Sequence, residues 1–320
     1  MLIEIVIFIA GLIALSWGAD RFVYGASALA KNIGISPMVI GMTIVAMGSS
    51  APEIMVAATA SYSGTPDTAI GNAIGSNITN ITLVLALTAL LKPILVSSIT
   101  VKRELPILLI VSLIAAFFLA DHAFKFWEGS VLMVLFFITI GGLAWLSIRS
   151  DKQDPLAQES MEEVPDGVPT GKAVFWVIVG LIVLPLSADF MVDSAVLIAR
   201  HFGLSDLIIG LTIIAIGTSL PELAASIAGV LKGEDDLAMG NIIGSNIFNI
   251  LAVLAMPGLI APGVIDPNAV NRDIYVMLGA TVLLVAFSFN IGGNRNINRW
   301  QGGLLLACFI AYQIWLFQGI

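Results

Sequence analysis

The sequence predicts an all-α integral membrane protein of ten transmembrane helices, arranged as two inverted five-helix repeats with broken helices at the midplane. Three observations predict it: an apolar composition, ten long apolar stretches and a duplication within the chain. Of 320 residues, 58% are hydrophobic and 11% are charged, and the mean hydropathy is +1.00. Soluble domains carry about 25% charged residues. We therefore expect the outer surface of this chain to face lipid.

The apolar stretches have the length of membrane helices. A helix needs about 20 mostly apolar residues to cross a bilayer. Continuously apolar runs such as 131–146 lack the alternation of a membrane β-barrel. The ten expected spans lie near 2–24, 37–61, 69–91, 104–121, 127–148, 173–197, 206–231, 238–260, 274–290 and 301–318.

The basic residues predict the orientation. The first apolar run has no preceding Lys or Arg and carries Glu4, so we expect it to remain as a span, not to be cleaved as a signal peptide. With ten spans, one side of the membrane holds eleven basic residues, and the other side holds Lys125, Arg200 and Arg272. The excess marks the cytoplasmic side. We therefore expect an inner (plasma) membrane protein with both termini outside and the 149–172 loop in the cytoplasm.

The 149–172 loop holds six acidic residues, in a chain whose formal net charge is −8. We expect a solvated linker, because about 24 residues are too few for a folded domain. Its six acids are Asp151, Asp154, Glu159, Glu162, Glu163 and Asp166.

The two halves of the chain are copies of each other at an offset of 169 residues. Residues 34–53 (GISPMVIGMTIVAMGSSAPE) match 203–222 (GLSDLIIGLTIIAIGTSLPE) at eleven of twenty positions. Residues 71–81 (GNAIGSNITNI) match 240–250 (GNIIGSNIFNI) at nine of eleven. Five spans per copy is an odd number, which inverts the second copy and is typical of secondary transporters. The expected units are 1–148, the 149–172 linker and 173–320.

One glutamate lies deep in the second span and one in the seventh, at equivalent positions of the copies: Glu53 and Glu222. A carboxylate near the bilayer centre costs roughly 2.5–3.5 kcal/mol on an insertion scale. Neither span contains a Lys or Arg to pair with it, so bound cations or protons are the remaining source of positive charge. A permanently protonated acid that only joins helices stays open as the alternative for each.

A proline precedes each glutamate. Because Pro52 and Pro221 lack an N–H, the carbonyls of Gly48 and Gly217, four residues earlier, lose their helical donor. We expect a helix break that turns carbonyl oxygens into a polar cavity. Hydroxyls three and four residues before each glutamate share its helix face, and ion contact is expected for Ser49, Ser50, Thr218 and Ser219.

A second polar stripe follows in the third and eighth spans, at a spacing of four residues: Asn72, Ser76 and Asn80, and Asn241, Ser245 and Asn249. For Asn72 and Asn241, interhelical hydrogen bonding and ion contact are equal alternatives, and ion contact is expected for the other four. The glycine pairs beside them allow a neighbouring helix to approach closely; these are Gly71 with Gly75 and Gly240 with Gly244.

The expected site is built of oxygen alone. His122 and His201 lie at span ends, and the single cysteine, Cys308, lies mid-span without a CxxC partner. Oxygen ligands select hard cations, and Ca²⁺ accepts six to eight of them in flexible geometry. Two glutamates supply a charge of −2, balanced by one divalent or two monovalent ions. Mn²⁺ and Sr²⁺ fit nearly the same cage.

At these motifs the sequence resembles the cation/calcium exchanger (CaCA) superfamily, specifically the prokaryotic sodium/calcium antiporters. The resemblance rests on GSSAPE and GNAIGSN in the first copy and on GTSLPE and GNIIGSN in the second. It implies electrogenic exchange of Na⁺ for Ca²⁺ by alternating access, in which the first and sixth spans slide past the others. It implies transported ions without a cofactor, and neither a nucleic-acid partner nor an obligate protein partner.

The resemblance also implies roles for individual residues. Glu53 and Glu222 would chelate Ca²⁺ with the carbonyls of Ser49 and Thr218. Flanking Na⁺ sites would use Ala46, Ser50 and Ser245 on one side, and Ala215, Ser219 and Ser76 on the other. Asn80 and Asn249 would complete the centre. Many relatives have an aspartate at one of these two positions, so this site loses a titratable group and potassium co-transport is disfavoured.

Three other functions are alternatives to Na⁺/Ca²⁺ exchange. In Ca²⁺/H⁺ exchange the two glutamates would take up protons, although a proton does not need the surrounding hydroxyls. An intramembrane enzyme is disfavoured, because no histidine lies beside an in-span serine to activate it. Broken helices that meet at the midplane fit an occluding carrier better than a channel.

Overall fold

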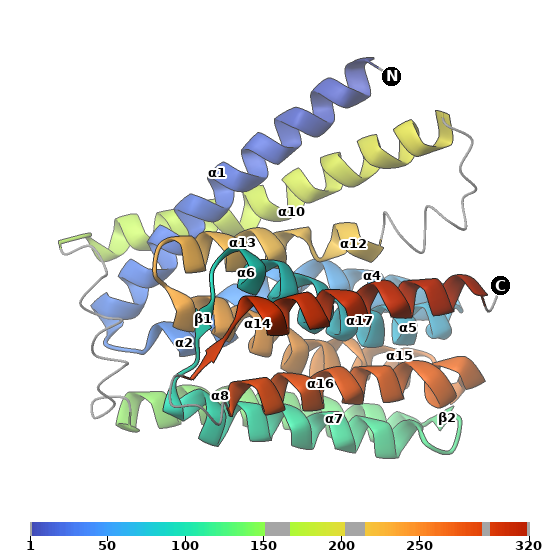
Figure 1. Ribbon diagram of the computed structural model, residues 1–320. Coiled ribbons are helices and arrows are strands. Elements are labelled where there is room, and N and C mark those ends of the chain that lie inside the picture. The colour runs from blue at the N-terminus through green and yellow to red at the C-terminus, as the bar shows by residue number, and fades with distance from the viewer. Residues whose placement is uncertain (1, 151–166, 202–214, 290–294, 319–320) are drawn as a thin grey trace.

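The structure is a computed structural model, described for residues 2–150, 167–201, 215–289 and 295–318. It is almost entirely helical (Figure 1). Its first half comprises α1 (Leu2–Ile33), α2 (Pro37–Ile40), η1 (Gly41–Val45), α3 (Ala46–Ser49), α4 (Ala51–Tyr62), α5 (Pro66–Thr79), η2 (Asn80–Leu85), α6 (Ala86–Leu91), β1 (Ile94–Leu95), η3 (Thr100–Glu104), α7 (Leu105–Leu119), β2 (Ala123–Phe124) and α8 (Phe126–Ser150).

The second half repeats this series. It comprises α10 (Thr170–His201), α12 (Ala215–Thr218), α13 (Leu220–Leu231), α14 (Asp235–Phe248), η6 (Asn249–Val253), α15 (Ala255–Ile260), β3 (Gly263–Val264), η7 (Ala269–Asp273), α16 (Ile274–Ser288), β4 (Asn296–Ile297) and α17 (Arg299–Gln318). From α12 to α16 nearly every element begins and ends 169 residues after its counterpart. The segments labelled η are π-helical, with wider turns than an α-helix.

Two short strand pairs join the two halves of the chain. In antiparallel pairs, β1 of the first half pairs with β4 of the second, and β2 pairs with β3. Each pair therefore joins one copy to the other, which is compatible with a twofold relationship between them. The inverted repeat as a whole stays a prediction.

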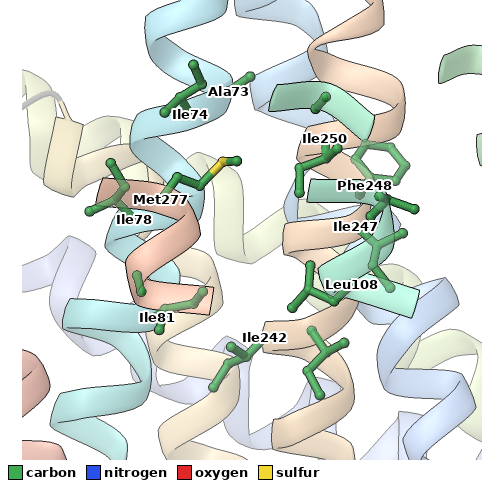
Figure 2. Packing of buried hydrophobic residues seen from close by; sticks show 14 of the residues in the cluster. Ala73, Ile74, Ile78, Ile81, Leu108, Ile242, Ile247, Phe248, Ile250 and Met277 are labelled. Atoms are coloured by element: carbon green, nitrogen blue, oxygen red, sulfur yellow. The ribbon is translucent and has the colours of Figure 1, made fainter. Parts of the chain in front are cut away.

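The helices that carry the polar stripes form the centre of the molecule. Of the apolar windows in 66–91 and 235–260, 78% and 89% are buried, against 22% of the window in α1. Isoleucines on α5 and α14, with Leu108 of α7 and Met277 of α16, make the packed core (Figure 2). The long helices α1 and α10 pack on each other and lie together along one side of this core (Figure 1). The central pair is thereby shielded from lipid, which permits it to hold polar side chains.

The span predictions hold in part. Six described helices are long and apolar enough to cross a membrane, and a seventh span is counted if 37–49 and 51–62 are one bent helix. The other expected spans coincide with described helices that do not meet this test, such as the 12-residue α13. Ten membrane spans therefore stay a prediction. Residues 206–214 of the expected seventh span, and all six acids of the linker, lie outside the described residues.

Several helices extend beyond the expected membrane spans. The first expected span stops at 24, whereas α1 continues to Ile33. Hydropathy marks where a chain leaves lipid and not where its helix ends. The end is set by Gly34, which has φ +74° and donates its N–H to the carbonyl of Ala30 at 2.9 Å. Glycine adopts this left-handed conformation at helix ends without steric cost. Similarly, α10 extends over Thr170–His201, beyond the expected 173–197.

Candidate cation site

Each candidate glutamate lies directly after a helix break. The break in the first copy is at Ser50 (φ −90°, ψ 9°), between α3 and α4, and the helix bends there by 44°. The break in the second copy is at Ser219 (φ −93°, ψ 4°), between α12 and α13. In both copies the following helix has proline at its second position, where a missing N–H does not disturb the helix. The predicted breaks are thus present at both positions.

The breaks place both carboxylates at helix N-termini inside the protein. Glu53 is the third residue of α4 and Glu222 the third of α13, and each is 1% exposed. The partial positive charge at a helix N-terminus stabilises a carboxylate there. The carboxylate of Glu222 reaches the helix break of the first copy, where it contacts Ser50, three residues before Glu53. Within the described residues neither forms an ion pair with Lys, Arg or His, so the structure brings the two charges together without a protein cation.

A hydroxyl of the first copy contacts the carboxylate of the second. Ser50 Oγ donates a hydrogen bond to Glu222 Oε1 at 3.2 Å, and both residues are buried. This bond joins the two breaks directly. The equivalent hydroxyl in the second copy, Ser219 Oγ, is buried and has no hydrogen-bond partner among the described residues.

Several other oxygens of the candidate site are buried without a hydrogen-bond partner in the described part of the chain. Leaving a polar group unpaired inside a protein is costly, so such a concentration indicates a site shaped to bind something else. The atoms are Glu53 Oε2, Glu222 Oε2, Asn80 Oδ1, Asn249 Oδ1 and Ser245 Oγ. All are hard oxygen donors, of the kind that Na⁺ and Ca²⁺ bind.

The two asparagines reach the site from π-helical turns. Asn80 is the first residue of η2 and Asn249 the first of η6. The helix that carries Glu53 packs on η6, and the helix that carries Glu222 packs on η2. Each glutamate therefore has the asparagine segment of the other copy beside it. Single π-helical turns inside α-helices occur frequently at functional sites.

Asn241 is a hydrogen-bonding residue of this site. Its Nδ2 donates to the carbonyl of Glu222 at 3.2 Å and to Ser226 Oγ at 3.0 Å, and its Oδ1 accepts from Ser49 Oγ at 3.4 Å. Of the two alternatives for Asn241, the structure favours interhelical hydrogen bonding. The sequence analysis did not identify Ser226. Its hydroxyl, four residues after Glu222 on the same helix, was the feature that could have indicated it.

The first copy lacks this hydrogen-bond network. The residue equivalent to Ser226 is Ala57, and Asn72 Nδ2 has no hydrogen-bond partner among the described residues. Instead, Asn72 lines a cavity of about 400 Å³ together with Ser76 and Thr218, two of the candidate ligands.

The two alanines among the candidates have no side-chain oxygen and could bind an ion only through their backbone carbonyls. Ala46 is fully buried, and its carbonyl accepts from the N–H of Ser50 at 2.9 Å and from Ser49 Oγ at 3.4 Å. A carbonyl has two lone pairs, so these bonds occupy the oxygen that an ion would use. Ala215 is the first residue of α12.

The glycine pairs also differ between the copies. A Cβ on Gly240 would lie 2.3 Å from the carbonyl oxygen of Met38, and one on Gly244 would lie 2.5 Å from the Cα of Met42. These glycines permit α14 to touch α2 and η1, as expected. For Gly71 and Gly75 no atom of the described residues lies within 4 Å of such a Cβ. Close packing is therefore confirmed for the second pair alone.

Comparison with known proteins identifies the family. The family model described as sodium/calcium exchanger protein matches residues 3–145 and 172–318. The putative antiporter CaxA of Alkalimonas amylolytica is 56% identical, covering 99% of this chain and all of that protein. Inner membrane protein YrbG of Escherichia coli K12 is 42% identical over 99% of this chain and 96% of its own length.

A solved structure agrees with these matches. The sodium-calcium exchanger NCX_Mj, soaked with zero Na⁺ and Ca²⁺, has a TM-score of 0.84 and 34% sequence identity, over 98% of this chain and 99% of the other. The similarity extends over both breaks and all the helices that carry candidate ligands. The chain therefore belongs to the sodium/calcium exchanger family, as a multi-pass membrane antiporter for cations and not an enzyme.

Proposed function

We propose that this protein exchanges Na⁺ for Ca²⁺ across the membrane by alternating access. One observation carries the proposal: two buried carboxylates from opposite copies lie beside hydroxyl and amide oxygens, and within the described residues these oxygens have no hydrogen-bond partner and the carboxylates no ion pair. Such a pair needs a charge of about +2 to be neutral. One Ca²⁺ or two Na⁺ supply it equally well, which makes the two ions exchangeable at one place.

The proposed ligands are the residues that the sequence identified. Glu53 and Glu222 hold Ca²⁺ with the carbonyls of Ser49 and Thr218, and the other candidates hold Na⁺. These are Ala46, Ser50 and Ser245 on one side, and Ala215, Ser219 and Ser76 on the other, with Asn80 and Asn249 at the centre. Ala46 has the weakest support, because its carbonyl already accepts two hydrogen bonds.

The surplus of neutral oxygens favours Na⁺ over H⁺ as the coupling ion. A proton binds to one carboxylate oxygen and needs no further ligand. The unpaired oxygens of Asn80, Asn249 and Ser245 would then remain buried without partners, which is costly. Na⁺ coordinates several such oxygens at once and removes that cost.

The membrane arrangement belongs to the same proposal. Two inverted units, 1–148 and 173–320, enclose the site, and the acidic 149–172 linker lies in the cytoplasm with both termini outside. The protein would then reside in the inner (plasma) membrane. Cysteine labelling at Glu4 and at Asp154 by a membrane-impermeant maleimide, in intact and in permeabilised cells, tests this orientation.

The exchange itself is tested by uptake of radioactive Ca²⁺ into proteoliposomes loaded with Na⁺. We expect uptake when Na⁺ flows outward, and no uptake when internal Na⁺ is replaced by choline at constant pH. A pH gradient without Na⁺ is the second arm. Uptake that ignores Na⁺ and follows the pH gradient would overturn the proposal in favour of Ca²⁺/H⁺ exchange. Competition by Mn²⁺ and Sr²⁺ measures the selectivity among divalent ions.

A further inference from the structure

Glu222 is held by the protein at both its side chain and its backbone. Its carboxylate accepts the hydrogen bond from Ser50 Oγ at 3.2 Å, and its backbone carbonyl accepts one from Asn241 Nδ2 at 3.2 Å. Asn241 lies on α14 and Glu222 in the first turn of α13, so the second bond fixes that turn to the neighbouring helix. The position of the Glu222 carboxylate is therefore set by contacts within the protein.

The amide of Asn241 is itself fixed by buried neighbours. Its Nδ2 also donates to Ser226 Oγ of α13 at 3.0 Å, and its Oδ1 accepts from Ser49 Oγ at 3.4 Å. These residues are at most 2% exposed, and hydrogen bonds are stronger in such surroundings than in water. Because both its NH₂ group and its oxygen are bonded, the amide cannot turn without breaking a contact. It joins α14 to two points of α13 and to the helix break of the first copy.

Glu53 lacks the corresponding contacts within the described part of the chain. The counterpart asparagine is Asn72, whose Nδ2 has no hydrogen-bond partner there. The counterpart of the serine on α13 is Ala57, which has no hydroxyl. The counterpart of the hydroxyl that reaches the carboxylate is Ser219 Oγ, which is also without a partner among these residues. The two glutamates occupy equivalent positions but are held unequally.

The helix that carries Glu53 is also less enclosed than the helix that carries Glu222. Both helices have 12 residues, of which three are buried in α4 and six in α13. On α4, Met55 and Val56 follow Glu53 closely and are 66% and 40% exposed. A segment with fewer buried residues has fewer contacts to lose when it shifts. The first turn of α4 can therefore move at lower cost than the first turn of α13.

Exchange at one site requires a carboxylate that moves, an argument that rests on the proposed exchange of Na⁺ for Ca²⁺. One Ca²⁺ draws both carboxylates to a single ion, with oxygens at about 2.3–2.6 Å. Two Na⁺ carry the same total charge but occupy separate places. At least one carboxylate must therefore change its position between the two occupied forms.

We propose that Asn241 is a positioning residue that fixes Glu222 as the preorganised ligand, and that Glu53 is the carboxylate that adjusts to the ion. A ligand that is already in place costs less ordering when the ion binds, and the contacts of Asn241 supply this order. A shift of the first turn of α4 then brings Glu53 to Ca²⁺ or withdraws it when Na⁺ is bound.

Equilibrium binding of radioactive Ca²⁺ to the purified full chain, in detergent without Na⁺, tests the proposal. Glu222→Asp and Glu53→Asp each keep the charge and shorten the side chain by one methylene group. We expect Glu222→Asp to weaken Ca²⁺ binding about tenfold more than Glu53→Asp, comparable to the loss of one hydrogen bond to a charged group. The reason is that α4 can shift to compensate, whereas α13 cannot. Thr281→Ala removes a buried hydroxyl of α16 that bonds within its own helix, and this control should bind Ca²⁺ like the unmodified chain.

Asn241→Ala separates positioning from a purely structural role. Once α13 is released it can also shift, so in this background the excess loss caused by Glu222→Asp should fall to about twofold or less, the sign of coupled residues. An asparagine that only stabilised the fold would lower the unfolding temperature and leave the tenfold excess unchanged. Ser226→Ala should reduce the excess in part, and it replaces Asn241→Ala if that variant does not fold.

The outcomes distinguish this inference from the proposed function. Equal losses from the two aspartate variants, a larger loss from Glu53→Asp, or an excess that folded Asn241→Ala and Ser226→Ala variants leave unchanged would overturn the inference and leave the proposed exchange intact. An unmodified chain that binds no Ca²⁺ would overturn the proposed function, and this inference with it.

Discussion

Ser50 and Glu222, which lie 172 residues apart in the chain, are joined by a buried hydrogen bond of 3.2 Å. The donor belongs to the helix break of the first copy and the acceptor to the break of the second. The reciprocal serine, Ser219, makes no hydrogen bond within the described part of the chain. Two residues that the sequence presents as equivalent therefore differ in their contacts, and this difference permits a matched experiment.

Replacing Ser50 should destabilise the protein more than replacing Ser219. Ser50→Ala removes a hydrogen bond to a buried carboxylate, and such bonds between membrane helices contribute about 0.5–2 kcal/mol. Ser219→Ala removes no bond that the structure contains. Thermal unfolding of both variants in detergent without Na⁺ and Ca²⁺ measures the difference. Equal losses of stability would contradict the observed asymmetry.

Glu53→Gln and Glu222→Gln should each abolish Ca²⁺ uptake without unfolding the protein. Each change removes one of the two charges that neutralise Ca²⁺. Because a buried carboxylate without a protein cation destabilises the fold, thermal stability in the absence of ions should stay equal or rise. Glu4→Gln, near the start of α1, is the charge-matched control and should keep full uptake. Full activity of either site variant would show that its carboxylate only joins helices.

Asn241→Ala should destabilise the protein, and Asn72→Ala should not to the same extent. Asn241 bonds to the Glu222 carbonyl, Ser226 and Ser49, and its loss leaves buried partners unsatisfied at about 1–3 kcal/mol. Ser226→Ala should reproduce part of this loss. A double-mutant cycle of Asn241 with Ser226, read by thermal unfolding, measures their coupling. Additive effects would show that the 3.0 Å contact carries no energy.

Gly240→Ala should prevent the close packing of α14 on α2. The added methyl group would lie 2.3 Å from the carbonyl oxygen of Met38, so the backbones must separate, at a typical overpacking cost of about 1–3 kcal/mol. Gly279→Ala in α16 is the control, because no described atom lies within 4 Å of its Cβ. Yield of monodisperse protein and unfolding temperature report the result. A Gly240→Ala variant as stable as Gly279→Ala would contradict this packing.

The sequence was sufficient to predict the helix breaks and the buried carboxylates. Proline at 52 and 221 has a local effect on the backbone that does not depend on the rest of the fold, and the duplication marked both positions at once. The π-helical turns at Asn80 and Asn249 left no comparable sign, because no residue type specifies a widened turn. The end of α1 likewise cannot be found from hydropathy, because the helix continues beyond the apolar stretch and ends at Gly34.

The asymmetry between the copies depends on contacts that no single motif contains. Asn72 and Asn241 occur in nearly identical segments. Asn241 donates a hydrogen bond to the hydroxyl of Ser226, whereas the equivalent residue in the first copy is Ala57, which has no hydroxyl. That the twelve candidate ligands act together in binding ions stays a prediction.

The crossed strand pairs have a consequence for how the protein is made. Because β1 pairs with β4 and β2 with β3, neither half can complete its own strand pairs. Synthesis proceeds from the N-terminus, so β1 stays without this partner until residues 296–297 have left the ribosome. The order of synthesis therefore makes both strand pairs late contacts, formed only when the second half has been made.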